Sequence, residues 1–117
     1  MKIAKLLIPL LLTLTFSSCS GLKGAGQAIK TSAVTVDKAT DAWATYVVVM
    51  NVGPDKQQQV RNAYAKYQLV MRAANKAYRD AYNSPTNMTN LYISIKLLKD
   101  SESTVITLIN MFKDSSQ

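Results

Sequence analysis

Apolar residues recur at intervals of three and four along three long segments of the chain, which is the spacing of one face of an α-helix. In the first segment they are Ile29, Ala33, Val36, Ala39, Trp43, Tyr46 and Met50. In the second they are Val60, Tyr64, Tyr67, Met71, Ala74, Tyr78 and Ala81. In the third they are Met88, Leu91, Ile95, Leu98, Val105, Ile109 and Phe112, with Glu102 in the heptad position between Leu98 and Val105. The pattern predicts three amphipathic helices.

Two breaks separate these segments. Asn51-Val52-Gly53-Pro54 ends the first helix, because Gly53 can adopt the left-handed conformation that closes a helix and Pro54 suits the first turn of the next. Asn83-Ser84-Pro85 ends the second. The expected helices span roughly residues 27–52, 54–83 and 86–113.

Helices of matched length with short connections favour an all-α, antiparallel three-helix bundle. The third helix has a second apolar row, formed by Ile93, Leu97, Leu108 and Met111. Its apolar arc therefore approaches about 220°, which is wider than one packed side requires. We expect this helix to pack against both others or to face an additional partner. The alternative architecture is a long helical hairpin that oligomerises through residues 86–113.

Composition narrows the class of protein. The chain has 117 residues, of which 48% are hydrophobic and 18% are charged, so a disordered chain is excluded and one domain is expected. There is no histidine and only one cysteine, which excludes histidine general-base catalysis, Cys/His zinc sites and an intrachain disulfide. No nucleophile has a visible base, and no glycine-rich phosphate loop follows a strand. We therefore expect neither an enzyme nor a bound cofactor.

The first 18 residues have the organisation of a cleaved export signal. Lys2 and Lys5 form a basic start, and a mostly apolar run follows over residues 6–16. Eleven residues of helix cover only about 16 Å, whereas a bilayer core is about 30 Å thick. Pro9 inside the run weakens a spanning helix further. The segment therefore favours a signal peptide over a membrane anchor.

Phe16-Ser17-Ser18-Cys19 closes this run with a bulky apolar residue, two small residues and the cysteine. This arrangement resembles the lipobox of bacterial lipoproteins, although Phe16 stands where leucine is commoner. The resemblance covers the first 20 residues and implies that Cys19 receives a diacylglyceryl group. It also implies cleavage just before Cys19 and acylation of the new amino terminus, as with palmitate. Several acyl chains at one residue give stable anchoring, because each buried CH₂ contributes about 0.8 kcal/mol.

The expected domain organisation follows from this resemblance. A signal peptide covers residues 1–18, a flexible glycine-containing tether covers 19–26, and the helical domain covers 27–117. Ser20 stands where an aspartate commonly retains lipoproteins in the inner membrane. In a Gram-negative host this implies an outer-membrane protein that faces the periplasm. Removal of the signal leaves 12 basic and 7 acidic side chains, a formal charge of +5.

A row of basic residues is one candidate interaction site. Arg61, Arg72, Lys76 and Arg79 fall within about 60° of arc on the polar face of the second helix, and we call them the basic stripe. Such a stripe can contact anionic lipid head groups or acidic wall polymers. The simpler interpretation is an ordinary solvated helix face.

Glu102 is a second candidate, because it occupies a heptad position of the third helix. A buried carboxylate needs a partner, and we expect a tyrosine hydroxyl or the Lys66 ammonium to supply it. The functional interpretation is a polar residue that sets the register of the helices or contacts another chain. The alternative is a glutamate at the edge of the bundle.

Two further groups of residues have simpler interpretations. Asp37 and Asp41 lie one turn apart, but two carboxylates are too few for a closed metal site, so a solvated face is favoured and no metal is expected. The tyrosines of the second helix could stack sugars or bases. At heptad spacing they are more often core residues whose hydroxyls reach the edge of the bundle. These residues are Tyr64, Tyr67, Tyr78 and Tyr82.

The leading hypothesis is a non-enzymatic, membrane-anchored envelope lipoprotein that acts as a small helical binding or structural module. Its expected partners are the membrane, through acyl chains on Cys19, and an envelope protein or second copy, through the third helix. Nucleic acid is not expected. The alternative is a lipoprotein of a phage or mobile element, acting in lysis or superinfection exclusion. A third hypothesis, an uncleaved holin-like membrane protein, conflicts with the charges within the third helix at Lys96, Lys99, Asp100 and Glu102.

Overall fold

The computed structural model of the chain describes residues 21–115. These residues form three long α-helices and one short 3₁₀ turn, and they contain no strand. The elements are α2 (Leu22–Met50), α3 (Pro54–Asn83), η1 (Pro85–Asn87) and α4 (Met88–Ser115). The predicted all-α three-helix bundle is confirmed.

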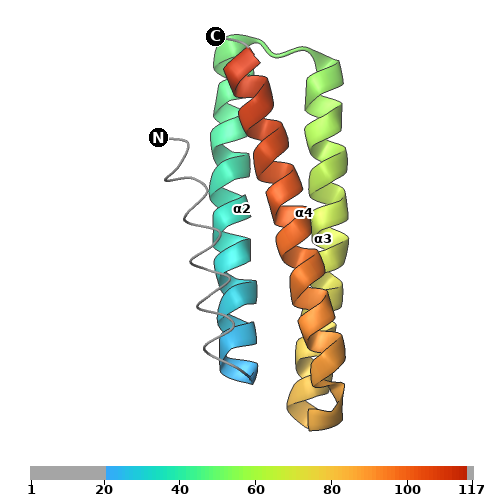
Figure 1. Cartoon of the computed structure of the whole chain (residues 1–117). Helices are drawn as coiled ribbons and strands as arrows, with labels where there is room; N and C mark the ends of the chain where they lie inside the picture. Colours follow the sequence, from blue (N-terminus) through green and yellow to red (C-terminus); the bar gives the residue numbers. More distant parts are fainter. Residues whose placement is uncertain (1–20, 116–117) are drawn as a thin grey trace.

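The three helices lie side by side along most of their length. In Figure 1, α2 rises from the lower end of the bundle, α3 descends from the turn at the top, and α4 rises again in front of them. The Tyr46 hydroxyl near the upper end of α2 donates to the Lys113 carbonyl near the end of α4, at 3.2 Å. At the lower end, Gly26 of α2 faces the Tyr78 side chain of α3. These contacts define the register of the bundle.

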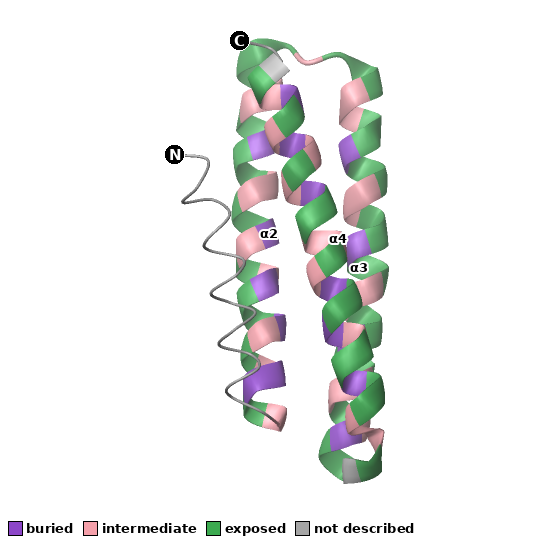
Figure 2. Cartoon of the chain, in the orientation of Figure 1, coloured by how far each residue is buried: buried purple, intermediate pink, exposed green. Residues whose placement is uncertain are grey.

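The core runs the length of the bundle, as Figure 2 shows, because each helix places its buried positions on the inward face. The buried apolar residues of α4 are Leu91, Ile95, Leu98, Val105, Ile109 and Phe112, all at predicted positions. Those of α3 are Val60, Tyr67, Ala74 and Ala81. Those of α2 are Ala25, Ile29, Val36 and Trp43. Full burial of one large aliphatic side chain contributes about 1.5–3 kcal/mol, so this column is the main stabilising feature.

The start of α2 differs from the prediction. The helix begins at Leu22, so residues 22–26 are helical and are not part of a flexible tether. Of the other predicted tether residues, Gly21 precedes the helix directly, and Cys19 and Ser20 lie outside the described part. Gly24 is buried, and a Cβ atom on Gly26 would lie 3.2 Å from the Tyr78 hydroxyl. Glycine here permits the close approach of α2 to α3.

The turn between α2 and α3 closes through Asn51, and the prediction that Gly53 takes the left-handed conformation is wrong. Asn51 has φ 51° and ψ 54°, and the Val52 N–H donates to the Val47 carbonyl at 3.1 Å. Asparagine tolerates this conformation better than other residues with a Cβ atom. Gly53 is extended and precedes α3, whose first turn begins with Pro54 as predicted.

The inward face of α2 is also displaced from the predicted one. Ser32 is buried, whereas its neighbour Ala33 is only half-buried. Met50, the last predicted core residue of this helix, is exposed. Alanine and serine differ little in size, so the spacing of apolar residues did not distinguish the two alternatives.

The wide apolar arc of α4 is only partly covered. α4 packs against both other helices, and most extensively against α3. In the second apolar row Leu108 is half-buried against the core, but Ile93, Leu97 and Met111 remain 54%, 52% and 56% exposed.

Candidate functional site

One polar side chain from each helix meets in the interior of the bundle. Ser32 of α2, Tyr67 of α3 and Glu102 of α4 occupy core positions at the same level, and we call them the polar layer. The Ser32 and Tyr67 hydroxyl oxygens are 2.9 Å apart, and both residues are buried. The Ser32 hydroxyl also hydrogen-bonds the half-buried Glu102 carboxylate. On α4 the fully buried Leu98 and Val105 flank the layer below and above.

The chemistry of the three groups assigns the direction of these hydrogen bonds. An ionised Glu102 can only accept, so Ser32 donates its one hydroxyl hydrogen to the carboxylate. The Tyr67 hydroxyl then donates to the Ser32 oxygen. Among the described residues, no buried side-chain nitrogen or oxygen lacks a hydrogen-bond partner. A satisfied network of this kind stabilises one arrangement of the helices over others.

The surroundings of the polar layer shift the pKa values of its groups. Burial raises the pKa of Glu102, and the Ser32 hydrogen bond and the positive charge of Lys99 offset part of that rise. Burial also raises the pKa of Tyr67, again partly offset by Ser32. Burial lowers the pKa of Lys99, and the charge of Glu102 offsets part of that change. Of the two expected kinds of partner, the structure places a tyrosine, Tyr67, in the same layer as Glu102, whereas Lys66 is exposed on α3. Ser32 and Lys99, which also lie beside Glu102, were not predicted.

The basic stripe lies on the exposed face of α3. Arg61 donates to two glutamine side chains one turn before it, at 3.3 and 3.4 Å. Lys76 forms an ion pair with Asp80 at 2.9 Å. Arg72 and Arg79 are exposed. The four residues therefore differ in their side-chain contacts, and the basic stripe runs along most of the length of α3.

Charge is distributed unequally on the two sides of the polar layer. We call residues 21–31 and 68–101 the lower half, and residues 33–66 and 103–115 the upper half, after their places in Figure 1. The lower half has seven basic and two acidic side chains, whereas the upper half has five basic and four acidic side chains. The basic residues of the lower half are Lys23, Lys30, Arg72, Lys76, Arg79, Lys96 and Lys99. All three helices contribute to this excess, so it is a property of the bundle.

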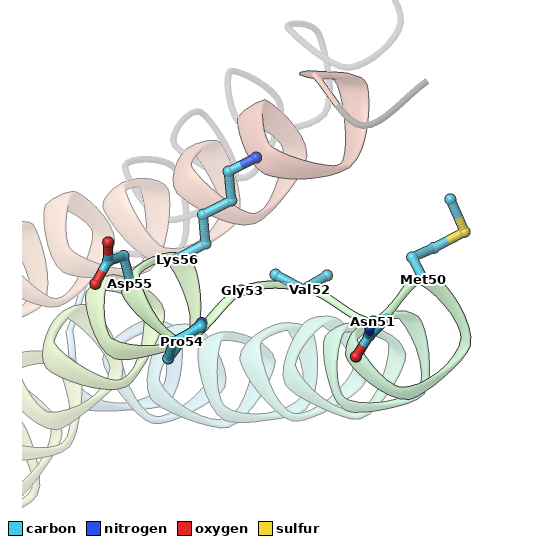
Figure 3. A pocket seen from close by; sticks show the side chains of 7 residues that line it. All are labelled: Met50, Asn51, Val52, Gly53, Pro54, Asp55 and Lys56. Atoms are coloured by element: carbon cyan, nitrogen blue, oxygen red, sulfur yellow. The ribbon is translucent and has the colours of Figure 1, made fainter.

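The turn between α2 and α3 encloses a hollow of about 360 Å³. In Figure 3 its side chains diverge: Lys56 extends toward α4, while Met50, Asn51 and Asp55 point in different directions. The Lys56 ammonium lies 5.6 Å from the centre of the Phe112 ring. A small-molecule site needs polar groups that converge, and this hollow does not provide them.

Metal-ligating clusters and membrane-spanning stretches are absent between Gly21 and Ser115. No three Cys, His, Asp or Glu side chains in that range could together hold a metal ion. None of its helices includes a stretch long and apolar enough to cross a bilayer. Asp37 and Asp41, one turn apart on α2, are both exposed.

Sequence analysis singled out Glu102 but missed the residues that act with it. Ser32 is spaced three and four residues from the buried Ile29 and Val36, but Ala33 fits the same periodicity, so spacing alone could not identify it. Lys23 and Lys96 could not have been grouped with the basic stripe, because the grouping depends on the register between helices.

Comparison with protein-family models, with curated proteins and with solved structures finds no match to this chain. The class of protein is therefore defined by its geometry, as a three-helix bundle with one internal polar layer and one strongly cationic half.

Proposed function

We propose that this protein is a non-enzymatic envelope lipoprotein. Acyl chains on Cys19 hold it on a membrane, and its three-helix bundle acts as a small binding or structural module. The observation that carries the proposal is the sequence Phe16-Ser17-Ser18-Cys19 at the end of a basic and then apolar leader.

The position of α2 is compatible with a protein held close to the bilayer. The helix begins at Leu22, three residues after Cys19. Three extended residues reach at most about 11 Å, so the lower end of the bundle would lie near the membrane surface. The turn between α2 and α3 would point away from it, with Val48 and Val49 exposed there.

The polar layer supports a structural rather than a catalytic role. Glu102 and Tyr67 have shifted pKa values, which in other proteins often mark active sites. Here both groups are joined through Ser32 within the core of the bundle. Their hydrogen bonds connect the helices to each other, so we assign them to fixing the register.

The experiment that tests the proposal is the intact mass of the protein isolated from membranes of its host, with a Cys19→Ala control. We expect a mass of residues 19–117 plus acyl groups, and we expect that species to be lost in the control. An unmodified full-length mass would contradict the proposal.

A further inference from the structure

We infer that the lower half of the bundle docks on the anionic lipid head groups of the bilayer that holds Cys19. The end of the bundle formed by the start of α2, the end of α3 and η1 then faces the bilayer. This inference rests on the proposed function, because the acyl anchor determines which end of the bundle faces the membrane.

Basic side chains from three helices lie close to this end. Lys23 is in the first turn of α2, and Arg79 is one turn before the end of α3. Lys76 and Lys96 lie about 10–12 Å from the lower ends of their helices, at 1.5 Å per residue. These distances are close to the Debye length, which is about 8–10 Å at moderate ionic strength, so screening weakens the attraction of these charges to an anionic surface without removing it.

Few carboxylates oppose this attraction in the lower half. Asp80 is bound to Lys76 at 2.9 Å, and Asp100 lies just below the polar layer. In the upper half two carboxylates lie close to the end, Asp55 in the first turn of α3 and Asp114 in the last turn of α4, and neither forms an ion pair with another described residue. An anionic surface therefore attracts one end of the bundle much more than the other.

An exposed aromatic residue marks the same end. Tyr82 lies in the last turn of α3 and is 69% exposed. Tyrosine is enriched where proteins meet the membrane interface, because its ring is apolar and its hydroxyl remains hydrated. The exposed residues Val48 and Val49 lie at the opposite end of α2, whose 29 residues separate the two ends.

The test uses the acylated protein, purified from membranes and reconstituted into phosphatidylcholine vesicles with or without phosphatidylglycerol. A water-soluble amine reagent labels exposed lysines, and mass spectrometry measures the labelling of each. We expect phosphatidylglycerol to slow labelling of Lys23, Lys76 and Lys96 about fivefold, the effect of roughly one charge contact at an anionic surface. Lys38 and Lys66, which are exposed in the upper half, should label equally in both vesicles.

The effect of high salt distinguishes docking of the lower half on the lipid head groups from anchoring through the acyl chains. High salt should abolish the protection while the protein stays with the vesicles, since acyl chains and not charges hold it there. Release of the protein from both kinds of vesicle would instead contradict the proposed anchor. Equal protection by dissolved inorganic phosphate, with phosphatidylcholine vesicles alone, would show that a soluble anion is the ligand and would overturn the inference.

Two matched triple variants complete the test. The lower-half variant is Lys23→Gln, Arg79→Gln and Lys96→Gln, and the upper-half variant is Lys38→Gln, Arg61→Gln and Lys66→Gln. All six side chains are exposed, so both variants should fold. Protection of Lys76 should be lost in the first variant and kept in the second. An equal effect of the two variants, or no protection by phosphatidylglycerol in the unmodified sequence, would overturn the inference.

Discussion

Ser32 joins all three helices through a single hydroxyl group. Its oxygen lies 2.9 Å from the Tyr67 hydroxyl, and it also hydrogen-bonds Glu102. Without this hydroxyl, a phenol and a carboxylate would remain in the interior with fewer partners. An unsatisfied buried polar group costs more than the net value of the hydrogen bond that satisfied it.

We expect Ser32→Ala to lower the free energy of unfolding by about 1–3 kcal/mol, because two partners lose a hydrogen bond at once. Urea unfolding followed by circular dichroism measures this change. Ser103→Ala, the same substitution at an exposed position of α4, is the control and should have little effect. Combining Ser32→Ala with Tyr67→Phe should cost less than the sum of the two single changes. Strict additivity would contradict the coupling between the two hydroxyls.

The raised pKa of Glu102 predicts how stability depends on pH. Its pKa is higher in the folded bundle than in the unfolded chain, so the folded state binds this proton more tightly. The stability that the proton provides is fully present below the unfolded pKa and is lost as pH rises through the folded pKa. Above the folded pKa the bundle therefore holds a partly desolvated charge.

Glu102→Gln should therefore raise the free energy of unfolding at neutral pH, because the amide oxygen still accepts from Ser32 without a charge. The gain should be small, on the order of 0.5 kcal/mol, since the side chain is only half-buried and the attraction of the Lys99 charge is lost. The difference should shrink as the pH falls and Glu102 of the unmodified protein becomes protonated. Asp100→Asn, at an exposed neighbouring position, should show neither effect. A loss of stability in Glu102→Gln at neutral pH would contradict this account.

The helices themselves begin and end for different reasons. α2 ends at Asn51 in the left-handed conformation, which residues with a Cβ atom adopt at a cost of about 1–2 kcal/mol, less for asparagine. α3 begins at Pro54, whose missing N–H and fixed φ suit a first turn.

Asn51→Gly should raise the free energy of unfolding by about 0.5 kcal/mol, because glycine adopts the left-handed conformation without strain. Asn51→Ala should lower it by about 1 kcal/mol for the opposite reason. Thermal unfolding of the two variants gives the comparison. Gly53→Ala is the control, because Gly53 is extended and a Cβ atom there meets no other atom within 4 Å. If Asn51→Ala and Gly53→Ala have equal effects, the backbone conformation at Asn51 is not the cause.

The success of prediction differed from helix to helix for physical reasons. The bounds of α3 could be predicted as residues 54–83, because a proline at each side acts through local sterics. The predicted start of α2 at residue 27 was wrong, because the helix begins at Leu22. Glycine residues in a sequence suggest flexibility unless a neighbour such as Tyr78 lies against them. Glu102 could be predicted as the unusual polar residue of its helix. Its partner Ser32 could not be predicted, because the periodicity of one helix does not determine which residues of another helix lie opposite it.

At the scale of the whole molecule, the main asymmetry is electrostatic. Among residues 21–115, seven basic and two acidic side chains lie below the polar layer, and five basic and four acidic side chains lie above it. Cations that favour an anionic surface also repel one another in the isolated bundle. In the upper half the nearly equal numbers of basic and acidic groups limit such repulsion. The lower half should therefore determine how the stability of the purified protein depends on salt.

We expect the free energy of unfolding to rise as ionic strength increases toward about 0.15 M, where the Debye length falls to about 8 Å and screens neighbouring cations. The rise should be modest, about 0.5–1 kcal/mol, because all the groups concerned are near the surface. Urea unfolding at low and at physiological ionic strength measures it. The lower-half variant (Lys23→Gln, Arg79→Gln, Lys96→Gln) should be more stable than the unmodified protein at low salt and should lose most of the salt dependence. The upper-half variant (Lys38→Gln, Arg61→Gln, Lys66→Gln) removes as many charges but leaves carboxylates without nearby cations, so it should gain nothing at low salt. If the unmodified protein loses stability as salt is added, attraction in the upper half outweighs repulsion in the lower half, and the cationic excess has no energetic consequence for the fold.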